Sequence, residues 1–195
     1  MAASNAQLSE PCLYEIIMTW LAFRIHLNGI YKKFASRLPI TGREVVLDFG
    51  CGMGTVAYHT AKKLPEGKLF CVDISEKWLI ACRRTLRRYE NVSFLCGEID
   101  CMSLPERSFD VIYIHYVFHD IPNNRLEAII PELSRLLKEN GKLLFRESFK
   151  DVTKIRFIQN LMEHSELHRE NSRITDIPFM GNALENVYRK NFKRI

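Results

Sequence analysis

EVVLDFGCGMGTVAYHTAKKLPEGKLFCVDIS, residues 44–75, contains two apolar runs separated by a glycine turn and an amphipathic segment. Residues 45–49 form the first run, which is rich in β-branched side chains and is typical of a strand buried on both faces of a parallel sheet. Residues 55–64 follow a helical pattern, and residues 69–72 form a second short strand. This strand–helix–strand order predicts an α/β fold with an open, mostly parallel sheet.

Small and acidic residues follow the two strands at the points where they end. Gly50, Gly52 and Gly54 come directly after the first strand, and glycine lets a ligand approach the main chain more closely than a Cβ atom allows. A helix that starts just past such a turn directs free amide groups and the positive end of its dipole at the same spot. Asp73 ends the second strand, where a carboxylate accepts two hydrogen bonds from a ribose diol. These features predict a nucleoside pocket at the carboxyl edge of the sheet.

The spacing of the glycines narrows the choice of nucleoside. A dinucleotide fingerprint has a third small residue that packs helix on strand, at the position that Thr55 occupies here. Asp48 lies two residues before the first glycine, where its carboxylate would repel a pyrophosphate but attract a cationic amino group, directly or through water. This GxGxG turn preceded by an acid resembles the first motif of the class I methyltransferases, which bind S-adenosylmethionine, a ligand with an ammonium, a sulfonium and no phosphate.

Three later segments extend this resemblance over roughly residues 40–150. In that family the third strand ends in a pattern like GDV or GDA and is followed by a short SFD, which correspond here to residues 97–99 and 108–110. The late motif of the family, a helix followed by GG or NG and an apolar strand, is similar to LSRLLKENGKLLFRES at residues 133–148. Motifs in this order imply a Rossmann-like three-layer sandwich with a mostly parallel sheet.

The resemblance also implies which residues bind each part of the cofactor. Asp48 and the glycine turn would hold the amino acid portion, Asp73 the ribose, and Glu98 with Ile99 the adenine. The full set of implied cofactor-binding residues is Asp48, Gly50, Cys51, Gly52, Gly54, Asp73, Ile74, Glu98, Ile99 and His115. The expected chemistry is an in-line displacement at the sulfonium methyl, for which the protein aligns the acceptor and excludes water. It requires no metal, and we predict no metal site.

The segment HYVFHDIP, residues 115–122, follows the fourth strand and is expected to face the acceptor. It resembles the HD-containing segment of small-molecule O-methyltransferases, in which a histidine removes the hydroxyl proton, and this implies that His119 is the catalytic base. The alternative is that His119 only packs or touches the cofactor. Nucleic-acid amino methyltransferases of this fold carry an Asn/Asp-Pro-Pro-aromatic motif here, which this chain lacks, so we expect a small-molecule acceptor rather than a nucleic acid.

Length and composition fit one domain of ordinary globular character. The chain has 195 residues and a net charge of +5, which permits an acidic partner without requiring one. The cysteines show no CxxC or Cys/His spacing, so reduced thiols in a cytoplasmic protein are expected rather than a metal or disulfide framework.

Residues 1–40 are predicted to form a helical lid or cap, too short and too charged to span a bilayer, and residues 41–195 the cofactor-binding domain. The oligomeric state is not predicted.

The last part of the chain departs from the family pattern. Family members end with an antiparallel strand pair, but residues 171–195 do not show two alternating strand patterns. We therefore expect these strands to be irregular, reduced or missing. The unusual tail raises one alternative to a small-molecule methyltransferase, a catalytically silent subunit that binds the cofactor and supports a partner enzyme. A second alternative is an NAD-type oxidoreductase.

Overall fold

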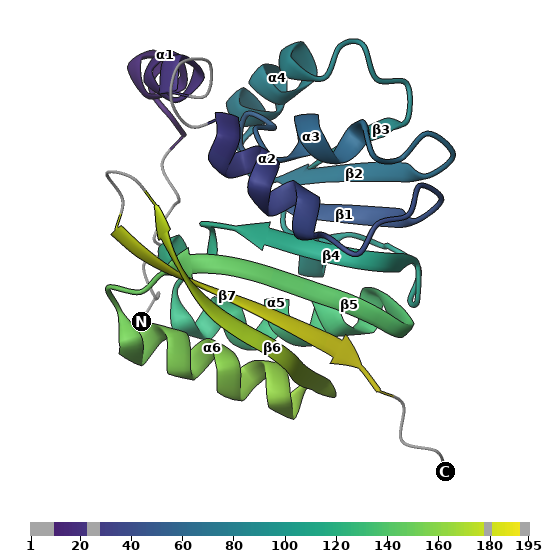
Figure 1. Ribbon diagram of the computed structural model, residues 1–195, viewed down its shortest axis with the longest axis vertical. Helices are drawn as coiled ribbons and strands as arrows, with labels where there is room; N and C mark the ends of the chain where they lie inside the picture. Colours follow the sequence, from purple (N-terminus) through teal and green to yellow (C-terminus); the bar gives the residue numbers. More distant parts are fainter. Residues whose placement is uncertain (1–9, 23–27, 178–180, 192–195) are drawn as a thin grey trace.

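A mixed sheet of seven strands forms the centre of the computed structural model, which describes residues 10–22, 28–177 and 181–191 (Figure 1). The strand order is β3-β2-β1-β4-β5-β7-β6. The first five strands in the chain run parallel to one another, while β7 runs antiparallel to both β5 and β6. Their bounds are β1 Val45–Phe49, β2 Lys68–Asp73, β3 Val92–Cys96, β4 Phe109–His115, β5 Leu137–Ser148, β6 Leu167–Ile177 and β7 Gly181–Lys190.

Helices cover both faces of this sheet, which confirms the predicted three-layer sandwich. Side chains alternate along β4, so Ile112 and Ile114 pack with helices α5 and α6, while Val111 and Tyr113 pack with α2, α3 and α4. Each face thus has its own apolar core. The bounds are α1 Leu13–Ala22, α2 Asn28–Arg37, α3 Ala57–Ala61, α4 Glu76–Thr85, α5 Asn123–Leu136 and α6 Val152–His164, with short 3₁₀ turns η2 Ile99–Cys101 and η3 Phe118–Asp120.

The prediction that the final antiparallel strands are reduced or missing is wrong, because β6 and β7 are both present and pair with each other in the seven-stranded sheet, and the expected irregularity is limited to a register shift in β6. Strand β6 is the edge of the sheet, and between Leu167 and Ile177 its side chains are almost all exposed. A register shift between Arg169 and Asn171 breaks its periodicity. Strand β7 is enclosed between two strands and buries polar side chains such as Glu185. Neither strand therefore shows the alternation of apolar and polar residues on which sequence-based strand prediction depends.

The order of the strands positions the ligand site. Strands β2 and β3 lie in succession on one side of β1, and β4 lies on the other side of β1. Ligands of open α/β sheets bind beyond the carboxyl ends of the strands at such a switch point. The carboxyl ends of β1, β2 and β4 carry the glycine turn, Asp73 and His115, which therefore converge at one edge of the sheet.

Helix α1 and the start of α2 lie at this same edge, while the rest of α2 packs on one face of the sheet (Figure 1). Helix α2 is anchored to the sheet domain, because Lys63 Nζ donates to the carbonyls of Ala35 and Leu38 at 3.0 Å and Arg37 pairs with Glu185. Residues 1–9 and 23–27 of the predicted 1–40 segment lie outside the described residues. Among the described helices, none combines the length and the apolar character needed to traverse a bilayer. Helix α1 exposes large apolar side chains: Leu13, Tyr14, Ile17, Met18, Trp20 and Leu21.

Candidate functional site

A cavity of about 1300 Å³ lies at the carboxyl ends of β1, β2 and β4. It brings together most of the residues that the sequence assigns to the cofactor, namely Gly50, Cys51, Gly52, Asp73, Ile74, Glu98, Ile99 and His115. Asp48, Gly54 and His119 lie next to the cavity but are not among its lining residues. Helices α1 and α2 contribute Glu15 and Tyr31 to the same wall. The cavity therefore joins the predicted nucleoside pocket to the N-terminal segment.

The turn after β1 is held against the ends of its two neighbouring strands. The amides of Gly50 and Cys51 both donate to the carbonyl of Val72, at 2.9 and 3.0 Å. Gly50 has a φ of +71°, and a Cβ there would lie 2.5 Å from a methyl carbon of Val117, so only glycine fits. At Gly52, by contrast, a Cβ would meet nothing within 4 Å. The turn thus presents bare main chain to the cavity, as contact with a nucleoside requires.

Asp73 is fixed at the end of β2 by two backbone amides. Its Oδ2 accepts from Gly52 N at 2.8 Å, and its Oδ1 accepts from Ser75 N at 3.0 Å. Burial raises the pKa of Asp73, while these two hydrogen bonds act in the opposite direction. Each carboxylate oxygen has two lone pairs, so both retain the capacity to accept a further hydrogen bond. This carboxylate at the cavity wall fits the two hydroxyls of a ribose.

Asp48, which is expected to attract the ligand ammonium directly or through water, lies beneath the surface of the site. Its side chain is buried, and Oδ2 accepts a 2.8 Å hydrogen bond from the Tyr113 hydroxyl. Burial raises the pKa of Asp48 well above its usual range, with the Tyr113 hydrogen bond opposing the shift. The carboxyl group lies under the turn and not on the cavity wall, so this geometry does not offer direct contact with a ligand ammonium.

The predicted adenine end is formed by the segment after β3. Ile99 is buried yet lines the cavity, whereas the Glu98 side chain is 45 % exposed. Arg125 of α5, which also lines the cavity, donates from Nη2 to Glu98 and to Asp100 at 3.0 Å each. Arg125 is not predicted from the sequence. It lies 27 residues after Glu98 along the chain, and only the fold brings its helix to this edge.

His115 ends β4 inside a group of aromatic rings, with ring centroids 4.9 Å from Phe34 and 5.5 Å from Tyr31. Arg146 Nη1 lies 3.2 Å from His115 Nε2, and because a guanidinium only donates, this nitrogen is the acceptor. Burial, followed by the charge of Arg146, lowers the pKa of His115 well below its ordinary value. His115 is therefore a neutral wall residue with its proton on Nδ1.

His119 is oriented by a carboxylate that is not predicted from the sequence. Glu147, at the end of β5, is buried, and its Oε2 lies 2.9 Å from His119 Nδ1. Its Oε1 accepts from the amides of Val117 and Phe118 at 2.7 Å, which fixes the carboxylate in place. The hydrogen bond with Glu147 raises the pKa of His119, while burial opposes it. Glu147 follows the apolar run of a parallel strand, a signal that could have identified it.

Tyr116 stands between these two histidines on the cavity wall. Its backbone has a φ of +59°, a conformation that non-glycine residues rarely adopt and that the surrounding structure must enforce. Its hydroxyl is buried and has no hydrogen-bond partner among the described residues. Burial raises the pKa of Tyr116 to about 12, so the hydroxyl keeps its proton and remains a donor. A buried donor of this kind is expected to pair with a polar group of a ligand.

Comparisons with known proteins identify the family of the domain that carries this site. A family model described as a methyltransferase domain matches residues 46–141, which span the strands that build the cavity. The malonyl-[acyl-carrier protein] O-methyltransferase of Bacillus cereus is 32 % identical over 129 residues, covering 64 % of this chain and 46 % of that protein. The tRNA N(3)-methylcytidine methyltransferase trm140 of Schizosaccharomyces pombe is 30 % identical over 189 residues, covering 89 % of this chain and 60 % of that protein. The chain spans about half the length of the curated relatives it matches.

The fold is also similar to that of solved methyltransferase structures. The N-methyltransferase NodS of Bradyrhizobium japonicum WM9, solved with S-adenosyl-L-homocysteine, superposes with a TM-score of 0.73 at 19 % identity, covering 88 % of this chain and 91 % of that one. The matched domain, the strand order and the bare turn beside Asp73 lead to one assignment. The chain belongs to the class I S-adenosylmethionine-dependent methyltransferases.

Proposed function

We propose that this protein transfers the methyl group of S-adenosylmethionine to a small-molecule acceptor. The observation that carries the proposal is that one cavity is lined both by the bare turn with Asp73 and by Tyr116, which we assign to the acceptor end together with the His119–Glu147 pair next to the cavity. A cofactor site and a candidate proton acceptor are thus adjacent. Bound S-adenosylmethionine supplies an activated methyl group, so the protein has to align, desolvate and deprotonate the acceptor.

The cofactor end of the cavity fits the charge and shape of this nucleoside. Asp73 is proposed to accept from the ribose hydroxyls, and the main chain at Gly50 and Gly52 to lie against the amino acid portion. Ile74 and Ile99 are proposed to contact the adenine ring, with Glu98 at its amino group. Asp48 acts on the ammonium only through the turn or an intervening water, because its carboxyl group lies below the cavity wall. Cys51 and His115 complete the lining, and Gly54 supports the turn from below.

The acceptor end supports proton removal by His119. Glu147 accepts from Nδ1, which leaves the Nε2 lone pair of the neutral ring available to an acceptor hydroxyl. The Asp120 carboxylate lies 3.4 Å from Nε2 and stabilises the ring once it is protonated. The unpartnered Tyr116 hydroxyl is proposed to hold a polar group of the acceptor. These contacts favour an acceptor that carries a hydroxyl group.

A tRNA nucleoside is the second candidate acceptor. It is favoured by the similarity to the tRNA methyltransferase of fission yeast, which covers 89 % of this chain. The lack of an Asn/Asp-Pro-Pro-aromatic motif after β4 argues against it, since residues 115–122 read HYVFHDIP. A small molecule remains the first candidate because residues of α1 and α2 help to line the cavity.

Residues 1–40 are proposed to form the lid of this site and residues 41–195 the domain that binds the cofactor. Glu15 and Thr19 of α1 and Ile30 and Tyr31 of α2 line the cavity, which supports the lid. Glu10 accepts a 2.6 Å hydrogen bond from the hydroxyl of Ser75, the residue that caps α4. This contact ties the start of the lid to the segment beside Asp73.

Methyl transfer from radiolabelled S-adenosylmethionine to a panel of phenols, carboxylic acids, amines and unmodified tRNA tests the proposal. We expect label on a hydroxyl-bearing small molecule, with turnover strongly reduced in His119→Ala. Label on tRNA alone would replace the small-molecule acceptor by the second candidate. Tight binding of S-adenosylmethionine without turnover on any acceptor would favour a silent supporting subunit, and binding of NAD alone would favour an oxidoreductase.

A further inference from the structure

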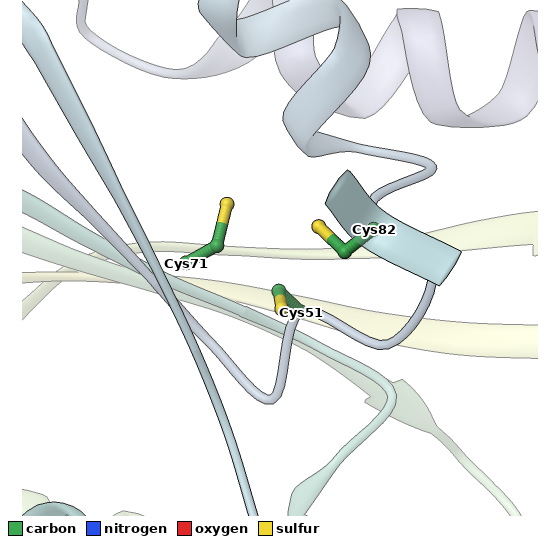
Figure 2. A group of neighbouring side chains, drawn as sticks. All are labelled: Cys51, Cys71 and Cys82. Carbon is green, nitrogen blue, oxygen red and sulfur yellow. The ribbon is translucent and has the colours of Figure 1, made fainter. Parts of the chain in front are cut away.

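Three cysteines from separate elements lie together directly below the cofactor turn (Figure 2). Cys51 belongs to the turn after β1, Cys71 to β2 and Cys82 to α4. Their sulfur atoms all lie within 4.8 Å of one another, and all three side chains are buried. None of the three is in a disulfide. Because the fold and not a short motif assembles them, spacing along the sequence could not reveal this group.

The arrangement suits a soft metal ion. Thiolates select ions such as Zn²⁺ and Cu⁺ over the hard ions that prefer oxygen. A Zn–S bond of about 2.3 Å puts two sulfur ligands of a tetrahedral site roughly 3.8 Å apart. Sulfur atoms already within 4.8 Å of one another need only small side-chain movements to reach this geometry. Cys51 also lines the cofactor cavity, which provides a route for an ion from solvent.

We propose that Cys51, Cys71 and Cys82 bind one soft, thiophilic metal ion beneath the turn that holds the cofactor. On binding, each thiol that still carries a proton loses it to solvent, and the electron pair of its sulfur forms the bond to the ion. No electron is gained or lost by either side, so the step needs no oxidant. This site does not depend on methyl transfer, and its test is a binding measurement.

The surroundings of the three sulfurs support the proposal. Gly54 lies next to Cys82: a Cβ there would be 2.7 Å from Cys82 Sγ, so the absence of a side chain leaves room for this sulfur. Apolar side chains such as Leu79 and Val56 belong to the same cluster and exclude water. A low-dielectric pocket strengthens bonds between an ion and its anionic ligands.

A second group of candidate ligands serves as a contrast. Glu98, Asp100 and Cys101 also place their ligand atoms within 4.8 Å of one another. However, Arg125 already donates to both carboxylates at 3.0 Å, and Glu98 and Cys101 are exposed. These acids therefore have a cationic partner within the chain, and we propose no metal site there.

The test uses the full chain, reduced and freed of metal under anaerobic conditions. It is titrated with Cd²⁺, whose thiolate complexes absorb in the ultraviolet, and with Zn²⁺ in competition with a chromophoric chelator. We expect one ion per chain together with a thiolate charge-transfer band. The control variant carries Cys12→Ser, Cys96→Ser and Cys101→Ser, which removes the exposed cysteines and should bind the ion as the parent protein does.

Removal of a direct ligand should weaken binding sharply. We expect Cys71→Ala and Cys82→Ala each to lower the affinity more than about 100-fold, beyond the 10- to 100-fold effect of residues that only support a ligand. X-ray absorption of the zinc-loaded parent protein should show three sulfur neighbours, and this readout does not require the variants to fold. The proposal is overturned if the parent protein binds no ion, if the exposed-cysteine control loses it, or if the bound zinc shows fewer than three sulfur neighbours.

Discussion

Single residues decide whether the cavity binds a nucleoside, and Asp73 is the most direct example. Its two oxygens are already positioned by the amides of Gly52 and Ser75 and keep lone pairs for a ligand. We predict that Asp73→Ala weakens binding of S-adenosylmethionine at least tenfold, about 1.4 kcal/mol. Titration calorimetry measures this change. Glu139→Ala removes an exposed carboxylate near the start of β5 and serves as the control, for which the dissociation constant should not change. Equal constants for Asp73→Ala and the parent protein would refute the ribose contact.

The His119–Glu147 pair determines the pH dependence expected of turnover. A base acts when it is neutral, and Glu147 raises the pKa of His119 above its ordinary value of 6.5, so turnover should rise with pH through that raised pKa. In Glu147→Gln the pKa falls, which moves the acidic limb of the profile to lower pH. The glutamine amide also donates to Nδ1, which moves the ring proton to Nε2 and removes the basic lone pair.

The expected loss in kcat for Glu147→Gln is roughly 10²- to 10⁴-fold, the usual contribution of a general base. Steady-state kinetics from pH 5 to 9 measures both the loss and the shift. His119→Ala, the variant expected to reduce turnover strongly, has a matched control in His168→Ala. This control removes an exposed histidine of β6 and should leave turnover unchanged. If the dependence of turnover on pH is the same in the parent protein and in Glu147→Gln, Glu147 does not control the pKa of His119 and has only a structural role.

Gly54 tests whether the turn is fitted closely to α4. Its φ is +80°, and a Cβ at this position would lie 2.7 Å from Cys82 Sγ, so Gly54→Ala has to strain the backbone and displace the sulfur. We predict a lower melting temperature. Gly29→Ala is the control, because a Cβ there meets nothing within 4 Å and alanine favours the helix, so it should stabilise by about 0.4–1 kcal/mol. Thermal unfolding should therefore show a melting temperature below that of the parent protein for Gly54→Ala and above it for Gly29→Ala.

At the scale of elements, the β6–β7 hairpin is joined to the rest of the sheet by a buried ion pair. Glu185 of β7 pairs with Arg146 of β5, with Arg37 of α2 and with Arg173 of β6, and the side chains of Glu185 and Arg146 are almost fully buried. Removing one partner leaves a buried charge without compensation, which costs about 3–5 kcal/mol. We predict a loss of this size for Glu185→Gln in urea unfolding.

The matched control for this prediction is Glu170→Gln in β6. Glu170 also pairs with more than one cation, namely Lys142 and Arg189, but its side chain is 30 % exposed. Pairs with this access to solvent contribute about 0–1 kcal/mol. Equal losses in the two variants would contradict the role assigned to burial at Glu185.

The elements also show how far the sequence predicts the structure. The turn at residues 50–54 and Asp73 could be placed because strand, turn and helix are neighbours along the chain. The hairpin was missed because an exposed edge strand and an enclosed polar strand lack the expected alternation. Glu147 and Arg125 were missed because they reach the site through contacts between distant segments. Asp48 was placed on the correct strand, but its pairing with the Tyr113 hydroxyl depends on the packing of β1 beside β4.

The function of the protein depends on which nucleoside the cavity binds. Calorimetry with S-adenosylmethionine and, separately, with NAD tests this most directly, because Asp73 suits the ribose of either ligand and only the rest of the site distinguishes them. We predict one S-adenosylmethionine per chain, binding that Asp73→Ala weakens, and no measurable binding of NAD. Binding of NAD with no heat from S-adenosylmethionine would contradict the assignment of the cavity to this cofactor.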